Sequence, residues 1–63
     1  MVWHDDSTVG VTCMGVPFYA AVRCENGRFV KGEVAAADKI SYASCASVNS
    51  VLEKPIKWSG IPV

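Results

Sequence analysis

Apolar and polar residues alternate along three stretches of the first half of the chain, near residues 8–14, 17–24 and 28–35. In the first stretch, Val9, Val11 and Cys13 share one side, with smaller or more polar residues between them. Such a period of two is typical of strands that bury one face. The pattern therefore predicts three β-strands.

The turn between the second and third stretches contains Asn26-Gly27, a strong hairpin signal. A two-residue turn there would mix apolar and charged residues on one face, which a half-buried sheet resists. A three-residue loop over 25–27, with Gly27 left-handed, instead places Val22 opposite Val30 and Phe18 opposite Val34. This second register gives one apolar face, and we expect it.

A second turn, Gly15-Val16, precedes Pro17 and suits a type II′ geometry with glycine first. It would pair Val11 with Ala20, again on the apolar face. Agreement between two turns favours a three-stranded antiparallel meander over residues 8–35. Its expected core residues are Val11, Ala20, Val22, Val30 and Val34.

An apolar sheet face needs a cover, and the segment 37–53 has apolar and small residues at helical spacing. We expect a helix there, ended by Pro55. The alternative is a strand through Ile40 and Tyr42 followed by a shorter helix. The expected fold class is thus α+β in a single domain, 1–63, with residues 1–7 and 55–63 as terminal arms. The extended C-terminal tail could also add a fourth strand.

Composition limits the function. The chain has 63 residues, 51% of them apolar, and its six basic residues balance six acidic ones. Zero net charge argues against a strongly electrostatic role on nucleic acid or an anionic membrane. No apolar run is long enough to span a bilayer, and the first residues do not resemble a secretion signal. We therefore expect a cytoplasmic protein without membrane contact.

Three cysteines, Cys13, Cys24 and Cys45, are a poor disulfide or zinc framework, because their number is odd and their spacing wide. The meander would separate Cys13 from Cys24 by about 20 Å, too far for a disulfide. His4 with Asp5 and Asp6 offers metal-ligand atoms, but adjacent residues near a chain end converge poorly on one ion. We predict three free thiols, no metal site and no cofactor.

Catalysis is not expected. A serine or cysteine nucleophile would need the only histidine, His4, as its base, and no nucleophile or phosphate-binding motif is present. One small sheet and one helix would also enclose a substrate poorly. The sequence favours a non-enzymatic protein.

The outer face of the predicted sheet carries aromatic residues beside cations; the candidate binding residues are Tyr19, Arg23, Arg28, Phe29 and Lys31. Such a face suits a protein interface, where aromatic residues and arginine are enriched. It could also stack single-stranded bases or be an ordinary solvated surface. We expect a protein partner, with nucleic acid as the alternative. The chain would then be an accessory, regulatory or inhibitor protein.

Self-association is expected too. A core of this size is marginal alone, and several large apolar residues have no cover in the predicted fold. The candidate contacts between copies are Trp3, Met14, Ile56 and Trp58.

Overall fold

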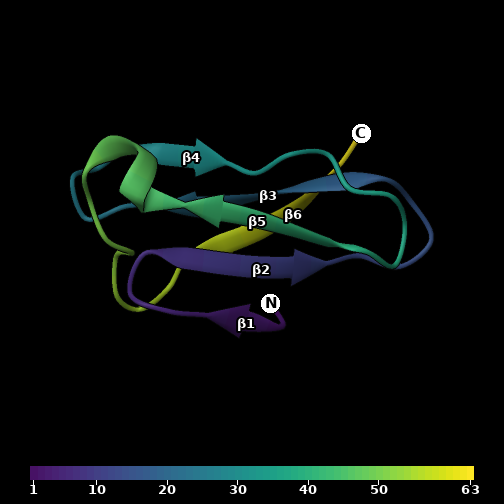
Figure 1. Cartoon of the computed structure of the whole chain (residues 1–63), viewed down its shortest axis with the longest axis horizontal. Coiled ribbons are helices and arrows are strands. Elements are labelled where there is room, and N and C mark those ends of the chain that lie inside the picture. The colour runs from purple at the N-terminus through teal and green to yellow at the C-terminus, as the bar shows by residue number, and fades with distance from the viewer.

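The computed structural model describes residues 1–63 and contains six strands in two antiparallel sheets (Figure 1). One sheet has the order β1-β2-β5 and the other β4-β3-β6. The strands are β1 (Trp3–His4), β2 (Thr8–Thr12), β3 (Phe18–Arg23), β4 (Phe29–Lys31), β5 (Ile40–Ser44) and β6 (Trp58–Pro62). The only helix is a short 3₁₀ turn, η1 (Cys45–Val48). No helix of the chain is long and apolar enough to cross a membrane.

The α+β prediction is wrong, because no α-helix covers the sheet. Within 40–45 the buried residues are Ser41, Ala43 and Cys45, which alternate with exposed Ile40 and Tyr42. This is the period of a strand, so the alternative reading of the segment is the correct one. Asp38 also has a φ of 66°, which a helix interior excludes. A second sheet, rather than a helix, covers the first.

The predicted meander is wrong as well, although its second hairpin is right. Val22 pairs with Val30, and Gly27 has a φ of 84°, as the three-residue loop requires. Gly15 is also left-handed, with a φ of 88°, but it joins strands of different sheets. β2 pairs with β1 and β5 instead of β3. The chain turns there from one sheet to the other.

The end segments, expected as arms, each supply an edge strand. β1 pairs with β2, and β6 pairs antiparallel with β3 from Phe18–Pro62 to Val22–Trp58. β6 runs close to the end of β2 in the other sheet. A Cβ at Gly60 would lie only 2.6 Å from the Cys13 sulfur. Only glycine fits at that position without a shift of its neighbours.

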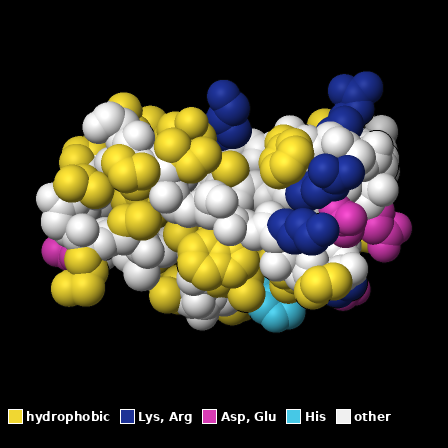
Figure 2. All heavy atoms as spheres, turned by 180° about the vertical axis from the view of Figure 1, so that it is seen from behind, with side chains coloured by type: hydrophobic (Ala, Val, Ile, Leu, Met, Phe, Trp, Pro, Cys, Tyr) yellow, Lys and Arg dark blue, Asp and Glu magenta, His cyan; other side chains and the backbone are white.

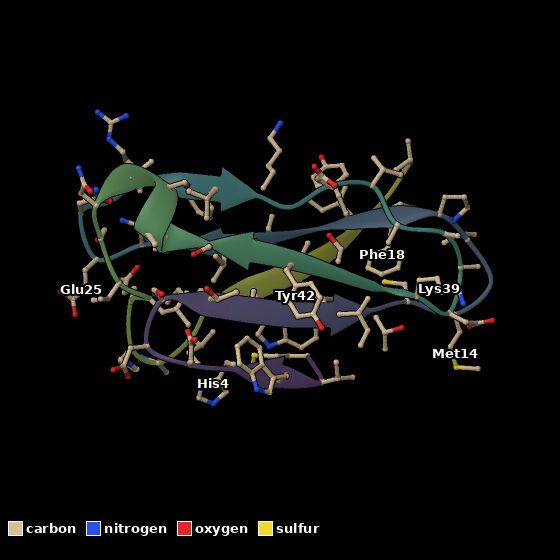
Figure 3. The ribbon with its side chains drawn as sticks, viewed as in Figure 1. His4, Met14, Phe18, Glu25, Lys39 and Tyr42 are labelled. Carbon is tan, nitrogen blue, oxygen red and sulfur yellow. A yellow bond between two sulfur atoms is a disulfide. The ribbon has the colours of Figure 1, made fainter.

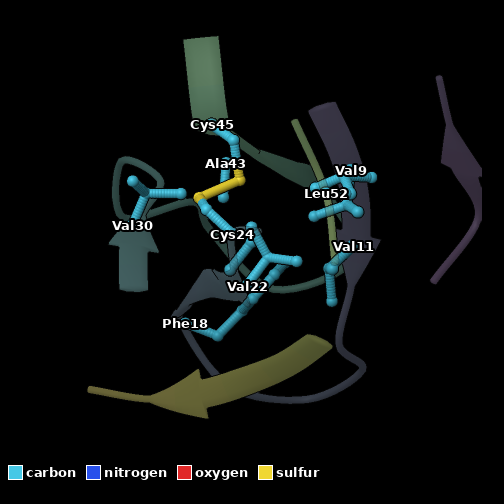
Figure 4. Packing of buried hydrophobic residues seen from close by; sticks show 10 residues of the cluster. Val9, Val11, Phe18, Val22, Cys24, Val30, Ala43, Cys45 and Leu52 are labelled. Atoms are coloured by element: carbon cyan, nitrogen blue, oxygen red, sulfur yellow. A yellow bond between two sulfur atoms is a disulfide. The ribbon is translucent and has the colours of Figure 1, made fainter. Parts of the chain in front are cut away.

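The core lies between the two sheets (Figure 4). β3 contributes Phe18, Ala20 and Val22, while β2 contributes Val9 and Val11. Other buried apolar residues are Cys24, Val30, Ala43, Cys45 and Leu52. Four of the five expected core residues are therefore buried.

The fifth, Val34, is 61% exposed, so that prediction is wrong. Phe18 pairs with Ala35 rather than Val34, while Val22 still pairs with Val30. The β4 side therefore carries one extra residue between the two pairings, which is the geometry of a bulge. The extra residue leaves Val34 facing solvent.

A disulfide joins Cys24, after β3, to Cys45, at the end of β5, with 5.7 Å between their Cα atoms. The prediction of three free thiols is wrong, because the fold brings Cys24 and Cys45 together although they are 21 residues apart in the sequence. The bond lies at one end of the buried cluster and links the two sheets covalently (Figure 4). Cys13 is the single free thiol and is partly buried. A cross-link of this kind reinforces a core that is small for independent stability.

Candidate interaction surface

The outer face of the β4-β3-β6 sheet brings together four of the five predicted binding residues. β3 supplies Tyr19 and Arg23, and β4 supplies Phe29 and Lys31. Arg23 pairs directly with Phe29, so both side chains point away from the core. Phe29 is 65% exposed, which is unusual for a large aromatic residue on a regular strand. We call Tyr19, Arg23, Phe29, Lys31 and Lys57 the basic face.

The sequence pattern does not predict Lys57 on this face, because it indicates only an extended arm over 55–63. The backbone N–H of Arg23 donates to the Lys57 carbonyl at 3.1 Å, which extends the β3–β6 register by one pair. Paired residues project from the same side of a sheet. Lys57 therefore lies beside Arg23 on the basic face. The one sequence signal that this segment is extended was the alternation of apolar Ile56 and Trp58 with charged Lys57.

Two cations lie over two rings of this face. The Arg23 guanidinium carbon is 5.6 Å from the centre of the Phe29 ring, and Lys31 Nζ is 5.7 Å from the centre of the Tyr19 ring. Both distances fall within the range of cation–π attraction. One side of each ring is thus occupied by a cation of the same chain.

Glu53 neutralises one of the cations. Its Oε2 lies 2.6 Å from Arg23 Nε, and neither atom has a further hydrogen-bond partner. The backbone reinforces this position, since the Glu53 N–H donates to the Arg23 carbonyl at 3.2 Å. Lys31 and Lys57 form no ion pair. The free positive charge of the face therefore resides on the two lysines.

Arg28, the fifth predicted residue, lies in the loop at the end of the same hairpin. Its N–H is held by the Asn26 side-chain oxygen at 3.1 Å, and its side chain is exposed. Seen from behind, the molecule shows several Lys and Arg side chains gathered over one half, with Asp and Glu side chains among them (Figure 2). The charge of the chain is balanced overall but is locally positive on this side.

The outer face of the β1-β2-β5 sheet has a different character. Trp3 pairs with Gly10, and Gly10 pairs with Tyr42, so one row crosses the three strands. The Trp3 and Tyr42 rings meet edge to face with 6.1 Å between their centres. A Cβ at Gly10 would lie 3.0 Å from the Tyr42 ring, so the glycine lets the rings lie close to the sheet. Tyr42 lies near the middle of this face (Figure 3).

The three strands of that sheet contain no Asp, Glu, Lys or Arg. We call Trp3, Gly10, Ile40 and Tyr42 the aromatic face; its large side chains are between 44% and 55% exposed. Sequence reasoning selected Trp3 but missed Ile40 and Tyr42, because it placed both on a helix. A period of two through Ile40 and Tyr42 was the signal that pointed to them.

The other expected contacts between copies are dispersed. Met14 is 86% exposed on the turn after β2 and projects from one end of the molecule (Figure 3). Ile56 packs against the chain's own core. Trp58 pairs with Val22 at the edge of the sheet and is 42% exposed. Only Trp3 lies on the aromatic face.

Two open hollows mark the surface. The larger, about 560 Å³, is lined by Ser7, Glu25, Ala46, Asn49, Ser50 and Val51. The smaller, about 260 Å³, runs beside the aromatic face and is lined by Glu33, Val34, Ala35, Ile40, Ser41 and Tyr42. Neither hollow contains His4 or a cysteine.

His4, Asp5 and Asp6 do not form a metal site. No three His, Cys, Asp or Glu side chains of the chain converge. Asp5 instead accepts the N–H groups of Ser7 and Thr8 at 2.9 and 2.8 Å, which closes the turn between β1 and β2. These hydrogen bonds lower the pKa of Asp5, since they favour its charged form. Cys24 and Cys45, joined to each other, offer no thiolate to a metal.

Comparison with protein-family models, with curated proteins and with solved structures finds no match to this chain.

Proposed function

We propose that the chain is a small non-enzymatic interaction domain that binds a partner protein through its basic face. The observation that carries this proposal is Phe29, which is 65% exposed on strand β4 and lies among cations. Exposed aromatic side chains beside arginine are typical of the centres of protein interfaces. A domain of this kind would act as an accessory, regulatory or inhibitor protein.

A protein partner is favoured over nucleic acid. Base stacking needs open ring faces, whereas Lys31 and Arg23 each cover one side of a ring. Glu53 also neutralises Arg23, and the whole chain has no net charge. Counterion release from phosphates would therefore be small.

We also propose that the chain self-associates, with the aromatic face as the contact between copies. An isologous contact places a patch against itself, so a patch without charge avoids like-charge repulsion. Trp3, Ile40 and Tyr42 meet this condition, because strands β1, β2 and β5 contain no Asp, Glu, Lys or Arg. The basic face would remain free for the partner.

An oxidising compartment is a better proposal than the cytoplasm. Disulfides persist in secreted, periplasmic or cell-surface proteins and are rare where thiols are kept reduced. The Cys24–Cys45 bond supports this change. The cytoplasmic expectation rested on short apolar runs and polar first residues, neither of which predicts this bond.

Affinity capture with the immobilised chain, compared among variants, tests the partner proposal. We expect Tyr19→Ala and Phe29→Ala to lose the captured protein, and Tyr42→Ala, on the opposite face, to retain it. Capture that survives both changes of the basic face would contradict the proposal. Salt-sensitive binding of single-stranded oligonucleotides, lost in Lys31→Ala with Lys57→Ala, would favour nucleic acid instead.

Sedimentation equilibrium tests self-association separately. We expect the wild-type chain to exceed monomer mass at micromolar concentration and Tyr42→Ala to reduce that mass. Phe29→Ala should leave the mass unchanged. A wild-type monomer would exclude this part of the proposal.

A further inference from the structure

The free edge of β4 presents backbone groups that no strand uses. β4 is the terminal strand of its sheet, with β3 on one side only. The residues that flank β4, Arg28 and Gly32, form hydrogen bonds with the β3 side of the hairpin. The Cys24 N–H donates to the Arg28 carbonyl and the Gly32 N–H donates to the Ala20 carbonyl, both at 2.7 Å. Antiparallel pairing alternates, so the N–H and C=O groups of Phe29 and Lys31 point away from β3. Figure 1 shows no element beyond β4 on that side.

The charged side chains beside the β4 edge determine which kind of strand can pair with it. Lys31 and Arg28 are exposed and have no carboxylate partner. An edge lysine discourages pairing between copies, because two such edges would bring like charges together. The same lysine attracts a strand that carries carboxylates. The edge is therefore matched to an acidic segment and mismatched to itself.

We propose that the β4 edge takes an extended acidic segment of the partner protein as an added strand. This inference rests on the proposed function and names how the partner engages the basic face. The main-chain bonds would go to Phe29 and Lys31, as in other cases of strand addition. A strand added beside β4 would widen the basic face by one row.

The positions of Phe29 and Lys31 also set the side-chain pattern of the segment. Both project from the basic face and are two residues apart, so alternate residues of the added strand lie beside them. An apolar residue beside Phe29 and a carboxylate beside Lys31 satisfy both. The residue between them faces the side of Val30, which is only 8% exposed, and should be small. The segment therefore alternates apolar and acidic residues on one face, with small residues between.

A short end-blocked peptide, in which Val and Glu alternate on one face with Thr between them, is the probe. We expect it to bind and to slow amide hydrogen exchange at Phe29 and Lys31, but not at Trp58 or Gly60 on the opposite edge. Its counterpart with Lys in place of Glu should not bind. Methylating a peptide nitrogen that faces β4 should weaken binding about tenfold, whereas methylating the next nitrogen should not.

A matched pair of chain variants isolates the backbone bond. Lys31→Ala removes the charge alone, while Lys31→Pro also removes the outward N–H, which β3 does not use. We expect Lys31→Pro to bind the peptide about tenfold more weakly than Lys31→Ala. If Lys31→Pro does not fold, the methylated peptides give the same comparison on the unmodified chain.

The possible outcomes separate this inference from the function on which it rests. A peptide that does not bind, or binds without changed exchange at Phe29 and Lys31, would exclude strand addition. Loss of the captured partner in Phe29→Ala would still support the proposed function in that case. Displacement of the peptide by an oligonucleotide would point to nucleic acid and contradict both.

Discussion

The Ser41 hydroxyl accepts a hydrogen bond from the backbone N–H of Ala20 at 3.0 Å, although the two residues lie in different sheets. The same hydroxyl donates to the Glu33 carbonyl at 2.7 Å. It thereby fills the gap that the bulge after β4 leaves in the ladder with β3. One buried side chain of β5 completes the hydrogen bonding of the opposite sheet.

Ser41→Ala should destabilise the fold by about 1–3 kcal/mol, because the change leaves a buried N–H without a partner. Urea unfolding of the variant and the wild type measures the difference. Ser47→Ala is the matched control, since Ser47 is exposed and bonds only to the Ser44 carbonyl. Equal effects of the two substitutions would argue against the bridging role of Ser41.

Alkylation should modify one cysteine of the folded chain without reductant and all three after reduction and unfolding. Reduction, or the double change Cys24→Ala with Cys45→Ala, should cost about 3 kcal/mol for a closed loop of this length. That loss is similar to the whole stability of many domains this small, roughly 3–5 kcal/mol. Cys13→Ala serves as the control that keeps the cross-link. Three thiols modified before reduction would rule out the disulfide.

Gly32→Ala should be among the most damaging single changes, at about 3 kcal/mol or more. A Cβ there would overlap the Tyr42 carbonyl oxygen and lie 2.6 Å from Ser41 Oγ. Gly27→Ala separates this clash from backbone strain, because a Cβ at Gly27 meets nothing within 4 Å but its φ is 84°. We expect about 1–2 kcal/mol for Gly27→Ala. Thermal unfolding of both variants would reveal whether the order is reversed.

The turn between β1 and β2 should loosen at low pH. The pKa of Asp5 is lowered in the folded chain by the Ser7 and Thr8 N–H groups. Its stabilising effect is therefore complete above its ordinary pKa of 3.8 and is lost as the pH falls through the lower folded value. Amide shifts of Thr8 and the Trp3 indole signal, followed by NMR, should report the change together. Asp5→Asn should abolish that pH dependence while keeping one acceptor oxygen.

The β3–β4 hairpin could be predicted from the sequence because its turn chemistry and its apolar pattern are local. Asn26-Gly27 and the pairing of Val22 with Val30 agree without any knowledge of the second sheet. Four residues of the basic face follow directly from that register. Lys57 does not, since its place depends on β6 reaching β3 from the far end of the chain.

The pattern of segment 37–53 predicts a helix where the fold has a strand, and the reason is physical. Its serines, alanines and cysteine are compatible with several backbone states, and tertiary contacts decide among them. Cys45 forms a disulfide with Cys24, and Ser41 accepts a hydrogen bond from the Ala20 N–H, so both side chains must face β3. Neither the disulfide nor this hydrogen bond can be predicted from a local sequence pattern. The aromatic face could not be predicted either, because Ile40 and Tyr42 lie on the same strand, β5.

The interleaving of the two sheets has a consequence for how the chain reaches its fold. β1 and β2 pair with each other early in the sequence but need β5, while β3 needs β6, whose Pro62 pairs with Phe18. No contiguous half of the chain can build a whole sheet. Closing such long loops before their contacts form is entropically costly, and folding rates fall as pairing becomes less local. We therefore expect this domain to fold slowly for its size, with the β3–β4 hairpin forming first and with β5 and β6, whose partner strands are distant in the sequence, joining last.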